Sequence, residues 1–202
     1  MKVHNIEQRS EEWLQLKKGK IGGTRLKAVT AKNNLPLIYE LIAEEGVDEI
    51  EPSYTNEAMR WGIDMEPIAL HEYEKISGFQ VINSGWWESD FSELVGLSPD
   101  GSNENYTRAV EVKCPNTKTH VEYIIGDRIP AAYKMQVLMY FIVNTELQSL
   151  DFVSFDPRYT KKPVWVKRIH RDEVEEDAIF YTGVLKNFLA KLVQYRGKLN
   201  NS

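Results

Sequence analysis

The sequence predicts an α/β fold, in which a mixed central β-sheet carries helices on both faces. Strand-like segments occur in two groups, and helical segments precede, separate and follow them, which favours such a layered arrangement. No repeat, low-complexity tract or linker rich in Pro and Ser divides the 202 residues. We therefore expect residues 1–202 to form a single domain with a substantial core.

The N-terminal part of the chain is predicted to be helical. Ser10 is followed by EEW and can cap a short helix over residues 11–18, which a group of glycines then ends. Thr24 can cap a second short helix. The segment LPLIYELIAEEG (35–46) has helical apolar spacing and a glycine at its end. These helices are expected to precede the sheet in the chain.

The rest of the chain combines a long helix, the strands and two further helices. Residues 55–78 are predicted to form a long helix that is interrupted near Gly62 and Pro67. Pro130 can open another helix over residues 130–144. Strand patterns occur in FQVINSGWWES (79–89), ELVGLSPD (93–100), RAVEVKC (108–114), SLDFVSFD (149–156) and PVWVKRIH (163–170), and a long amphipathic helix covers residues 172–197.

Composition favours a soluble globular protein of a reducing compartment. Hydrophobic residues make up 42% and charged residues 27% of the chain. No apolar run approaches the roughly 20 residues of a membrane span. The first residues, MKVHNIEQRSEEW, have no apolar core, so we expect no secretory signal. Cys114 is the one cysteine and excludes an internal disulfide, so the cytoplasm is the expected location.

Charge is distributed unevenly along the chain, although the net charge is only -5. Residues 1–32 carry eight basic and three acidic residues, residues 33–104 carry two and sixteen, and residues 105–202 carry fifteen and eleven. The net acidic chain argues against indiscriminate nucleic-acid binding. The basic segment 17–32 has enough positive charge to bind a chain of phosphates. The acidic segment 33–104 suits either a metal-binding site or a charged surface that only keeps the protein soluble.

One stretch, GLSPDGSNENYTRAVEVKCP (96–115), carries charges in an unusual place. It is predicted to form a strand, a turn and a second strand. Alternation along the second strand places Glu111 and Lys113 on one face, and Val110, Val112 and Cys114 on the other. Asp100 ends the first strand, which can pair with the second as a hairpin. Two carboxylates and an ammonium group are therefore expected to converge on one small volume.

The chemistry of this group favours a hard divalent cation. Two neighbouring carboxylates repel each other unless a cation lies between them, and oxygen ligands suit Mg²⁺ or Mn²⁺. His4, His71, His120 and His170 are scattered, so no zinc-type cluster competes. Metal-assisted phosphodiester hydrolysis uses this set of groups. A structural salt bridge between Glu111 and Lys113 on a half-exposed strand is the alternative.

Further motifs resemble those of a known family. PD at 99–100 followed by EVK at 111–113 is the pattern of the PD-(D/E)xK nucleases. The segments SPDG, EVKCP, AYKMQV, FDPR and RWGIDMEP have the order and spacing found in lambda-type phage exonucleases, the YqaJ-like or alkaline exonuclease group. This resemblance extends from about Ser10 to Glu173. It implies a restriction-endonuclease-like core and a single nuclease domain.

The resemblance also implies roles for residues around the predicted hydrolytic centre. The family's metal ligands correspond to Glu66, Asp100, Glu111 and the backbone carbonyl of Val112. Lys113 resembles the lysine that positions the attacking water, and Gln136 matches a motif glutamine near the active site. Tyr133 lies one turn before Gln136, and for it we favour helix packing. A solvated helix charge is the alternative for Glu66.

A second set of residues corresponds to the family's pocket for a 5'-phosphate. The matching positions are Lys17, Thr24 and Ser98, and cations and hydroxyl groups are natural phosphate partners. Lys17 replaces the family's arginine and loses its bidentate fork, for which Lys18, Lys20 or Arg25 are candidate replacements. The alternative is a surface lysine and two helix-capping hydroxyls.

Met59 matches an apolar wedge that separates strands in related enzymes, although a core position is the alternative. The accompanying arginine position falls near Asn34, in the shortened loop AKNNLPL. The five tryptophans are expected to serve the core or a subunit interface.

The implied function is that of a Mg²⁺-dependent, processive 5'-to-3' exonuclease acting on double-stranded DNA ends, with Mn²⁺ as a substitute. It would leave 3' single-stranded tails for phage-type recombination by strand annealing. The resemblance further implies a ring-shaped homotrimer, a phage-type single-strand annealing protein as partner, and a phage or prophage protein in the bacterial cytoplasm. The alternatives are a PD-(D/E)xK endonuclease or repair nuclease, and a non-catalytic module that binds DNA ends.

Overall fold

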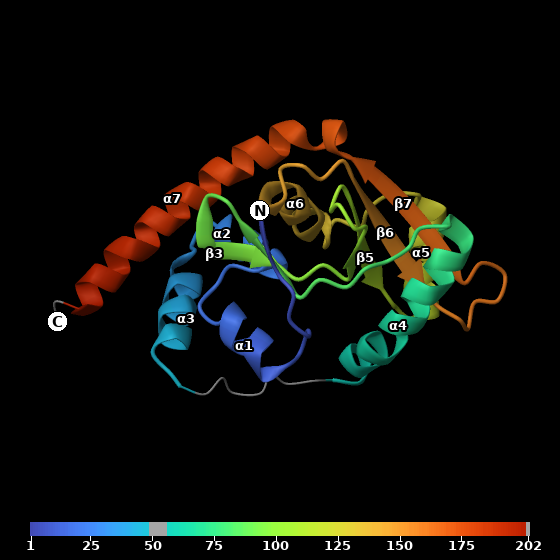
Figure 1. Ribbon diagram of the computed structural model, residues 1–202, viewed down its shortest axis with the longest axis horizontal. Helices are drawn as coiled ribbons and strands as arrows, with labels where there is room; N and C mark the ends of the chain where they lie inside the picture. The colour runs from blue at the N-terminus through green and yellow to red at the C-terminus, as the bar shows by residue number, and fades with distance from the viewer. Residues whose placement is uncertain (49–55, 201–202) are drawn as a thin grey trace.

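The computed structural model describes residues 1–48 and 56–200 (Figure 1). Its helices are α1 (Glu11–Lys17), α2 (Leu26–Val29), α3 (Leu35–Glu45), α4 (Glu57–Ser77), α5 (Thr117–Gly126), α6 (Lys134–Val143) and α7 (Glu175–Asn200). Its strands are β1 (Lys2–His4), β2 (Trp86–Ser89), β3 (Ser92–Leu97), β4 (Gly101–Ser102), β5 (Arg108–Lys113), β6 (Ser149–Phe155) and β7 (Val164–His170). Two short 3-10 turns, η1 (Gly23–Arg25) and η2 (Arg171–Glu173), complete the described elements.

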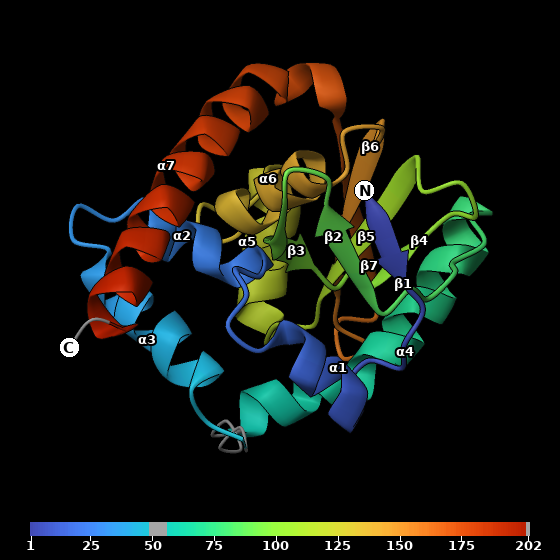
Figure 2. The same cartoon turned by 60° about the vertical axis from the view of Figure 1, so that its left-hand side comes forward.

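The strands form two sheets. β4, β5, β6 and β7 are neighbours in that order, and β5 pairs with β6 in parallel, whereas the other two pairings are antiparallel. β1, β2 and β3 form a smaller antiparallel sheet. In Figure 2, α4 and α6 lie on opposite sides of β5, and α7 extends along the outside of the molecule. The predicted mixed sheet with helices on both faces is therefore confirmed.

Strand alternation divides the core between the two faces of the larger sheet. Val110 and Val112 of β5 pack on the face that α4 covers, together with Tyr73 of that helix. Ala109 of the same strand and Phe152 of β6 belong to the larger apolar cluster, which includes most of α6. The sequence of β5 thus supplies an apolar side chain to both layers. Its one charged residue that is fully buried, Glu111, faces the α6 side.

Several predicted elements differ from the structure. α4 is one continuous helix, so the predicted interruption near Gly62 and Pro67 was wrong; position 55 lies outside the described residues. Pro67 has no backbone N–H, so the Ile63 carbonyl lacks its usual helical hydrogen bond. Both residues are exposed to water, which can bind that carbonyl instead. α6 begins at Lys134 instead of at Pro130, and the strand predicted at 79–89 is confined to β2.

Three elements have no counterpart among the predictions: β1, β4 and α5. β1 pairs with β2, and α5 follows directly after the strand that carries Glu111 and Lys113. α5 is rich in β-branched residues, which have low helix propensity, but the side chain of Asn116 accepts a hydrogen bond from the Thr119 amide and caps it. Within residues 1–48 and 56–200, none of the helices combines the length and the apolar character needed to cross a membrane.

Candidate active site

Asp100 reaches β5 by a route that differs from the predicted hairpin. The strand before it, β3, pairs with β2, and it is the short β4 after Asp100 that pairs with β5. Gly101 lies opposite Val110, so the aspartate is held beside the strand. The backbone amide of Val112 donates to Asp100 Oδ2 at 2.7 Å. The predicted pairing partner was wrong, but Asp100 does lie beside Glu111 and Lys113.

Glu111 is the buried centre of this group, with 1% of its side chain exposed. Its Oε1 accepts hydrogen bonds from Lys113 and, at 2.7 Å, from the Gln136 amide. Its Oε2 accepts a hydrogen bond from the Tyr140 hydroxyl at 2.7 Å. The alternative interpretation was a salt bridge between Glu111 and Lys113 on a half-exposed strand. This salt bridge exists, but the strand is buried and the pair belongs to a network that also includes Asp100.

Tyr140 is a site residue that the sequence prediction missed. It lies four residues after Gln136 on α6, so both side chains lie on the same face of the helix and reach the same carboxylate. Burial raises the pKa of the Tyr140 hydroxyl, and the charge of Glu111 adds to the rise. The hydroxyl therefore stays protonated and remains a donor. The i, i+4 spacing on a predicted helix was the one available signal.

The electrostatics of the site are those of a carboxylate pair beside one partly buried ammonium group, that of Lys113. Burial raises the pKa of Asp100 most, the charge of Glu111 raises it further, and Lys113 opposes the rise. For Lys113, burial disfavours the ammonium form, but the charges of Glu111 and Asp100 outweigh it and raise its pKa. Lys113 is thus held in its charged form while Asp100 resists ionisation.

Glu66 approaches this centre from α4. Its charge contributes to the raised pKa of Asp100, after burial and Glu111. Its carboxylate accepts a hydrogen bond from the Arg9 guanidinium at 3.0 Å, with 27% of the glutamate side chain exposed. Glu66 is therefore paired with an arginine, which differs from the solvated charge weighed as an alternative.

The donor set fits a hard divalent cation, although each carboxylate accepts a hydrogen bond from a donor of the protein: Glu66 from Arg9, Asp100 from the Val112 amide, and Glu111 from Lys113. Among the residues that the structure describes, no group of three or more His, Cys, Asp or Glu side chains is gathered closely enough to hold a metal ion. Glu66, Asp100, Glu111 and the buried Val112 still offer only oxygen atoms. Their mutual repulsion favours a cation that can be shared between them.

A cavity of about 770 Å³ joins the predicted phosphate pocket to the helix face that contacts Glu111. Lys17, Thr24 and Ser98 all line it, as do Gln136 and Tyr140, which hold Glu111. The predicted phosphate pocket and the side chains that hold the predicted hydrolytic centre therefore meet in one cavity. Thr24 lies within η1 and caps neither that turn nor α2, so its predicted capping role was wrong.

Trp13 contacts two residues of the predicted phosphate pocket. Its indole Nε1 donates to Ser98 Oγ at 2.7 Å, which leaves the serine hydrogen available to another acceptor. The Lys17 ammonium lies 3.5 Å from the centre of the Trp13 ring. Burial lowers the pKa of Lys17 to about 8, the charge of Arg25 lowers it in the same direction, and Glu44 opposes the change.

The three cations expected to replace the missing arginine fork have partners of their own. Arg25 forms ion pairs with Glu40 and Glu44 of α3. Lys20 pairs with Glu88 at 3.2 Å, and Lys18 donates to the Val47 carbonyl. Each is therefore engaged in holding the local structure.

Met59 is 47% exposed and lines the cavity, so the alternative of a core position does not hold. Asn34, near which the position of the accompanying arginine falls, accepts a hydrogen bond from the Lys191 ammonium of α7 at 2.7 Å. Tyr133 packs against Phe152, as favoured, and the Lys113 ammonium lies 5.2 Å from its ring centre. Trp86, Trp87 and Trp165 are buried in the core, whereas Trp13 and Trp61 are partly exposed.

Comparison with known proteins gives one family and a small set of similar structures. Residues 12–148 match the YqaJ-like viral recombinase domain. A search of curated proteins finds no match. The structure is similar to that of an alkaline exonuclease, LHK-Exo, from Laribacter hongkongensis, with 29% sequence identity and a TM-score of 0.78, over 95% of this chain and 99% of that chain. The same values hold for LHK-Exo in complex with dAMP.

A phage-related exonuclease from Haemophilus somnus 129PT is also similar, with a TM-score of 0.62 and 13% identity, over 88% of this chain and 96% of that chain. At this identity the similarity concerns the fold alone. The fold thus has counterparts among solved nuclease structures.

Proposed function

The chain belongs to the YqaJ-like viral recombinase domain family, and from this premise we propose that it is a Mg²⁺-dependent 5'-to-3' exonuclease that acts processively on double-stranded DNA ends. Mn²⁺ is expected to substitute for Mg²⁺. The name of the similar LHK-Exo supports exonuclease activity, and its complex with dAMP supports a mononucleotide as the class of product. The product DNA would carry 3' single-stranded tails for recombination by strand annealing.

The observation that carries the proposal is the shared cavity. Ser98 and Asp100 are separated by one residue, yet Ser98 lines the cavity beside Lys17, whereas Asp100 lies next to β5 and accepts a hydrogen bond from the amide that follows Glu111. A terminal phosphate held by Lys17, Thr24 and Ser98 would place the neighbouring phosphodiester near the carboxylates. This spacing favours removal of nucleotides from a 5' end over cutting within a duplex.

The residues have separable roles in this chemistry. A divalent ion held by Glu66, Asp100 and Glu111 would activate water and stabilise the charge that develops on the phosphate. Lys113 keeps its proton because the carboxylates raise its pKa, so it donates a hydrogen bond to the attacking water instead of acting as a base. Gln136 and Tyr140 fix the orientation of Glu111.

The proposal extends to assembly and setting. We infer a homotrimeric ring around DNA, a phage-type single-strand annealing protein as partner, and a phage or prophage protein in the cytoplasm of a bacterial host. These inferences rest on the resemblance of the motifs to those of lambda-type phage exonucleases. Met59, exposed on α4 at the edge of the cavity, would serve as the apolar wedge between the strands.

The test uses linear duplex DNA with 5'-phosphate ends and Mg²⁺. We expect the wild-type protein to release nucleotides from the 5' strand, and the Glu111→Ala and Lys113→Ala variants to lose at least about a hundredfold in rate, as when an electrostatic group at the reacting centre is removed. Chelation with EDTA should abolish hydrolysis. Degradation that is equal in wild type and variants would refute the proposal.

Covalently closed circular duplex distinguishes the alternative functions. An exonuclease leaves it intact, whereas a PD-(D/E)xK endonuclease or repair nuclease nicks it. A non-catalytic DNA-end-binding module would leave both circular and linear DNA intact and would bind no Mn²⁺ in a calorimetric titration. The buried network around Glu111 favours a catalytic function, since an end-binding module has no need of it.

A further inference from the structure

Arg9 stands out because its backbone has a conformation that side-chain-bearing residues rarely adopt. Its φ angle is 71°, in the left-handed region. Both neighbours are anchored: the Gln8 side chain donates to the Pro99 carbonyl at 2.8 Å, and the Ser10 hydroxyl accepts from the Trp13 amide at 3.2 Å. Backbone strain that is held in place by its surroundings is typical of functional sites.

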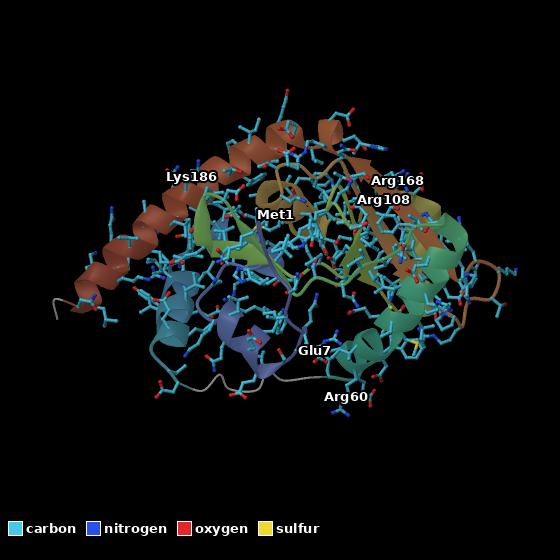
Figure 3. All side chains as sticks on the ribbon, viewed as in Figure 1. Met1, Glu7, Arg60, Arg108, Arg168 and Lys186 are labelled. Carbon is cyan, nitrogen blue, oxygen red and sulfur yellow. The ribbon has the colours of Figure 1, made fainter. Side chains whose placement is uncertain are left out.

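The anchors connect Arg9 to the candidate active site. Pro99 lies between Ser98, at the phosphate side of the cavity, and Asp100, at the hydrolytic centre. Arg9 itself lines the same cavity. In Figure 3, Glu7, two residues earlier, is labelled near the lower ends of α1 and α4, where this N-terminal segment passes between the two helices. The strained residue is thus presented to the cavity from the segment that precedes α1.

The guanidinium of Arg9 holds the carboxylate that a divalent ion would need. It donates to Glu66 Oε2 at 3.0 Å, and the Arg9 side chain is 48% exposed. A partly exposed ion pair contributes little stability, so a divalent cation can displace it. Once displaced, the guanidinium remains beside the cavity, in which Lys17 takes the place of the family's arginine and offers no bidentate contact.

Resting on the proposed function, we propose that Arg9 couples ion binding to DNA binding. Without the ion, Arg9 holds Glu66 in position. When a divalent ion takes Glu66, the guanidinium turns to a phosphate of the DNA in the cavity, where it supplies the bidentate contact that Lys17 cannot make. Ion and DNA end then bind cooperatively, and by linkage each strengthens the binding of the other.

The Arg9→Gly variant separates the guanidinium from the backbone. Glycine adopts a positive φ angle readily, so this variant should fold with an unchanged or higher melting temperature. Arg9→Lys keeps the charge but removes the fork. Lys186→Ala removes one positive charge from α7, away from α4, and serves as the matched charge control (Figure 3).

Two binding measurements test the coupling. Mn²⁺ affinity is measured by spin-resonance titration of the DNA-free protein, and end affinity is measured with a 5'-phosphorylated duplex carrying phosphorothioate linkages, with Mn²⁺ or with EDTA. Arg9→Gly should bind Mn²⁺ about twofold to tenfold more tightly than wild type, because the competing cation is gone. Mn²⁺ should raise the DNA affinity of the wild type, and we expect this increase to be about tenfold smaller in Arg9→Gly. Arg9→Lys should retain wild-type Mn²⁺ affinity and lose part of the DNA gain.

The outcomes separate this inference from the proposed function. A wild-type protein that binds no Mn²⁺ would overturn the proposed function, and the coupling with it. A wild-type protein that binds Mn²⁺, with Arg9→Gly equal to it or weaker, would overturn the coupling alone. The coupling alone would also be overturned if Mn²⁺ raised the DNA affinity of Arg9→Gly, Lys186→Ala and wild type equally.

Discussion

At the scale of single residues, two lysines of the site have opposite electrostatic environments. The carboxylates of Glu111 and Asp100 raise the pKa of Lys113 against the effect of burial. Lys17 has no such carboxylate pair beside it; burial and the charge of Arg25 lower its pKa to about 8, with Glu44 opposing. Lys113 is therefore charged at any pH at which the enzyme would work, whereas Lys17 changes charge within that range.

This difference predicts that the affinity for a 5'-phosphate end depends on pH. Lys17 is cationic below about pH 8 and becomes neutral above it, so the preference for 5'-phosphate over 5'-hydroxyl ends should fall about tenfold as pH rises from about 7 to about 9.5. Lys17→Arg keeps its charge throughout and should flatten the profile. End affinities measured by fluorescence anisotropy across this range test the expectation, and identical pH slopes for both proteins would contradict it.

At the scale of elements, a buried ion cluster fixes the sheet against the helix that carries Glu66. Asp151 of β6, which is fully buried, accepts hydrogen bonds from Arg108 of β5 at 2.5 Å and Arg168 of β7 at 2.7 Å. Figure 3 shows these two arginines labelled close together, beside the sheet. The Tyr73 hydroxyl of α4 also donates to Asp151, at 2.5 Å. Tyr73 follows Glu66 by two helical turns, so this contact sets the rotation of α4.

Removing the centre of that cluster should be costly. Asp151→Ala leaves two arginines without their buried partner, and we expect it to lower the free energy of unfolding by about 3–5 kcal/mol. The matched control is Glu122→Ala, which removes an exposed ion pair with Lys118 on α5 and should leave the free energy of unfolding nearly unchanged. Urea unfolding of the two variants checks this expectation. Similar losses in both would show that the cluster does not stabilise the sheet.

At the scale of the whole molecule, several basic residues of positions 1–32 are paired with acids or line the cavity. Arg25 and Lys20 are paired with acids of α3 and β2, while Lys17 and Arg9 line the cavity. Lys27 and Lys32 are exposed outside the cavity, so the cavity holds part of the positive charge of residues 1–32. The outer helix α7 exposes Ile179 and Phe180 by more than 60%, and such apolar side chains are often covered by a partner.

The proposed ring makes an assembly prediction. Native mass spectrometry should give a species of three times the chain mass, and covalently closed duplex, which offers no free end for threading, should be bound less tightly than linear duplex. A protein that remains monomeric at micromolar concentration, yet degrades linear duplex processively, would argue against the ring while leaving the hydrolytic site intact.

Much of the fold was predictable because its signals are local. The period-two alternation of β5, the Ser10 cap of α1 and the apolar spacing of α3 each depend on a few consecutive residues. The errors arose where local signals mislead. Pro67 lies within an unbroken helix, since its solvent-facing position tolerates the lost hydrogen bond. The motif residues of the site were predictable by type and spacing, although their roles remain proposals.

The sequence by itself determined which side chains share a face of β5 and which motifs the chain contains, because neighbours along a strand are fixed by the backbone. Only the tertiary structure decided that β4 brings Asp100 to the strand, that Tyr140 reaches Glu111, and that Arg9 pairs with Glu66. Arg9 and Glu66 lie 57 residues apart in the chain. Their contact depends on how the N-terminal segment passes α4, and no local pattern encodes that packing.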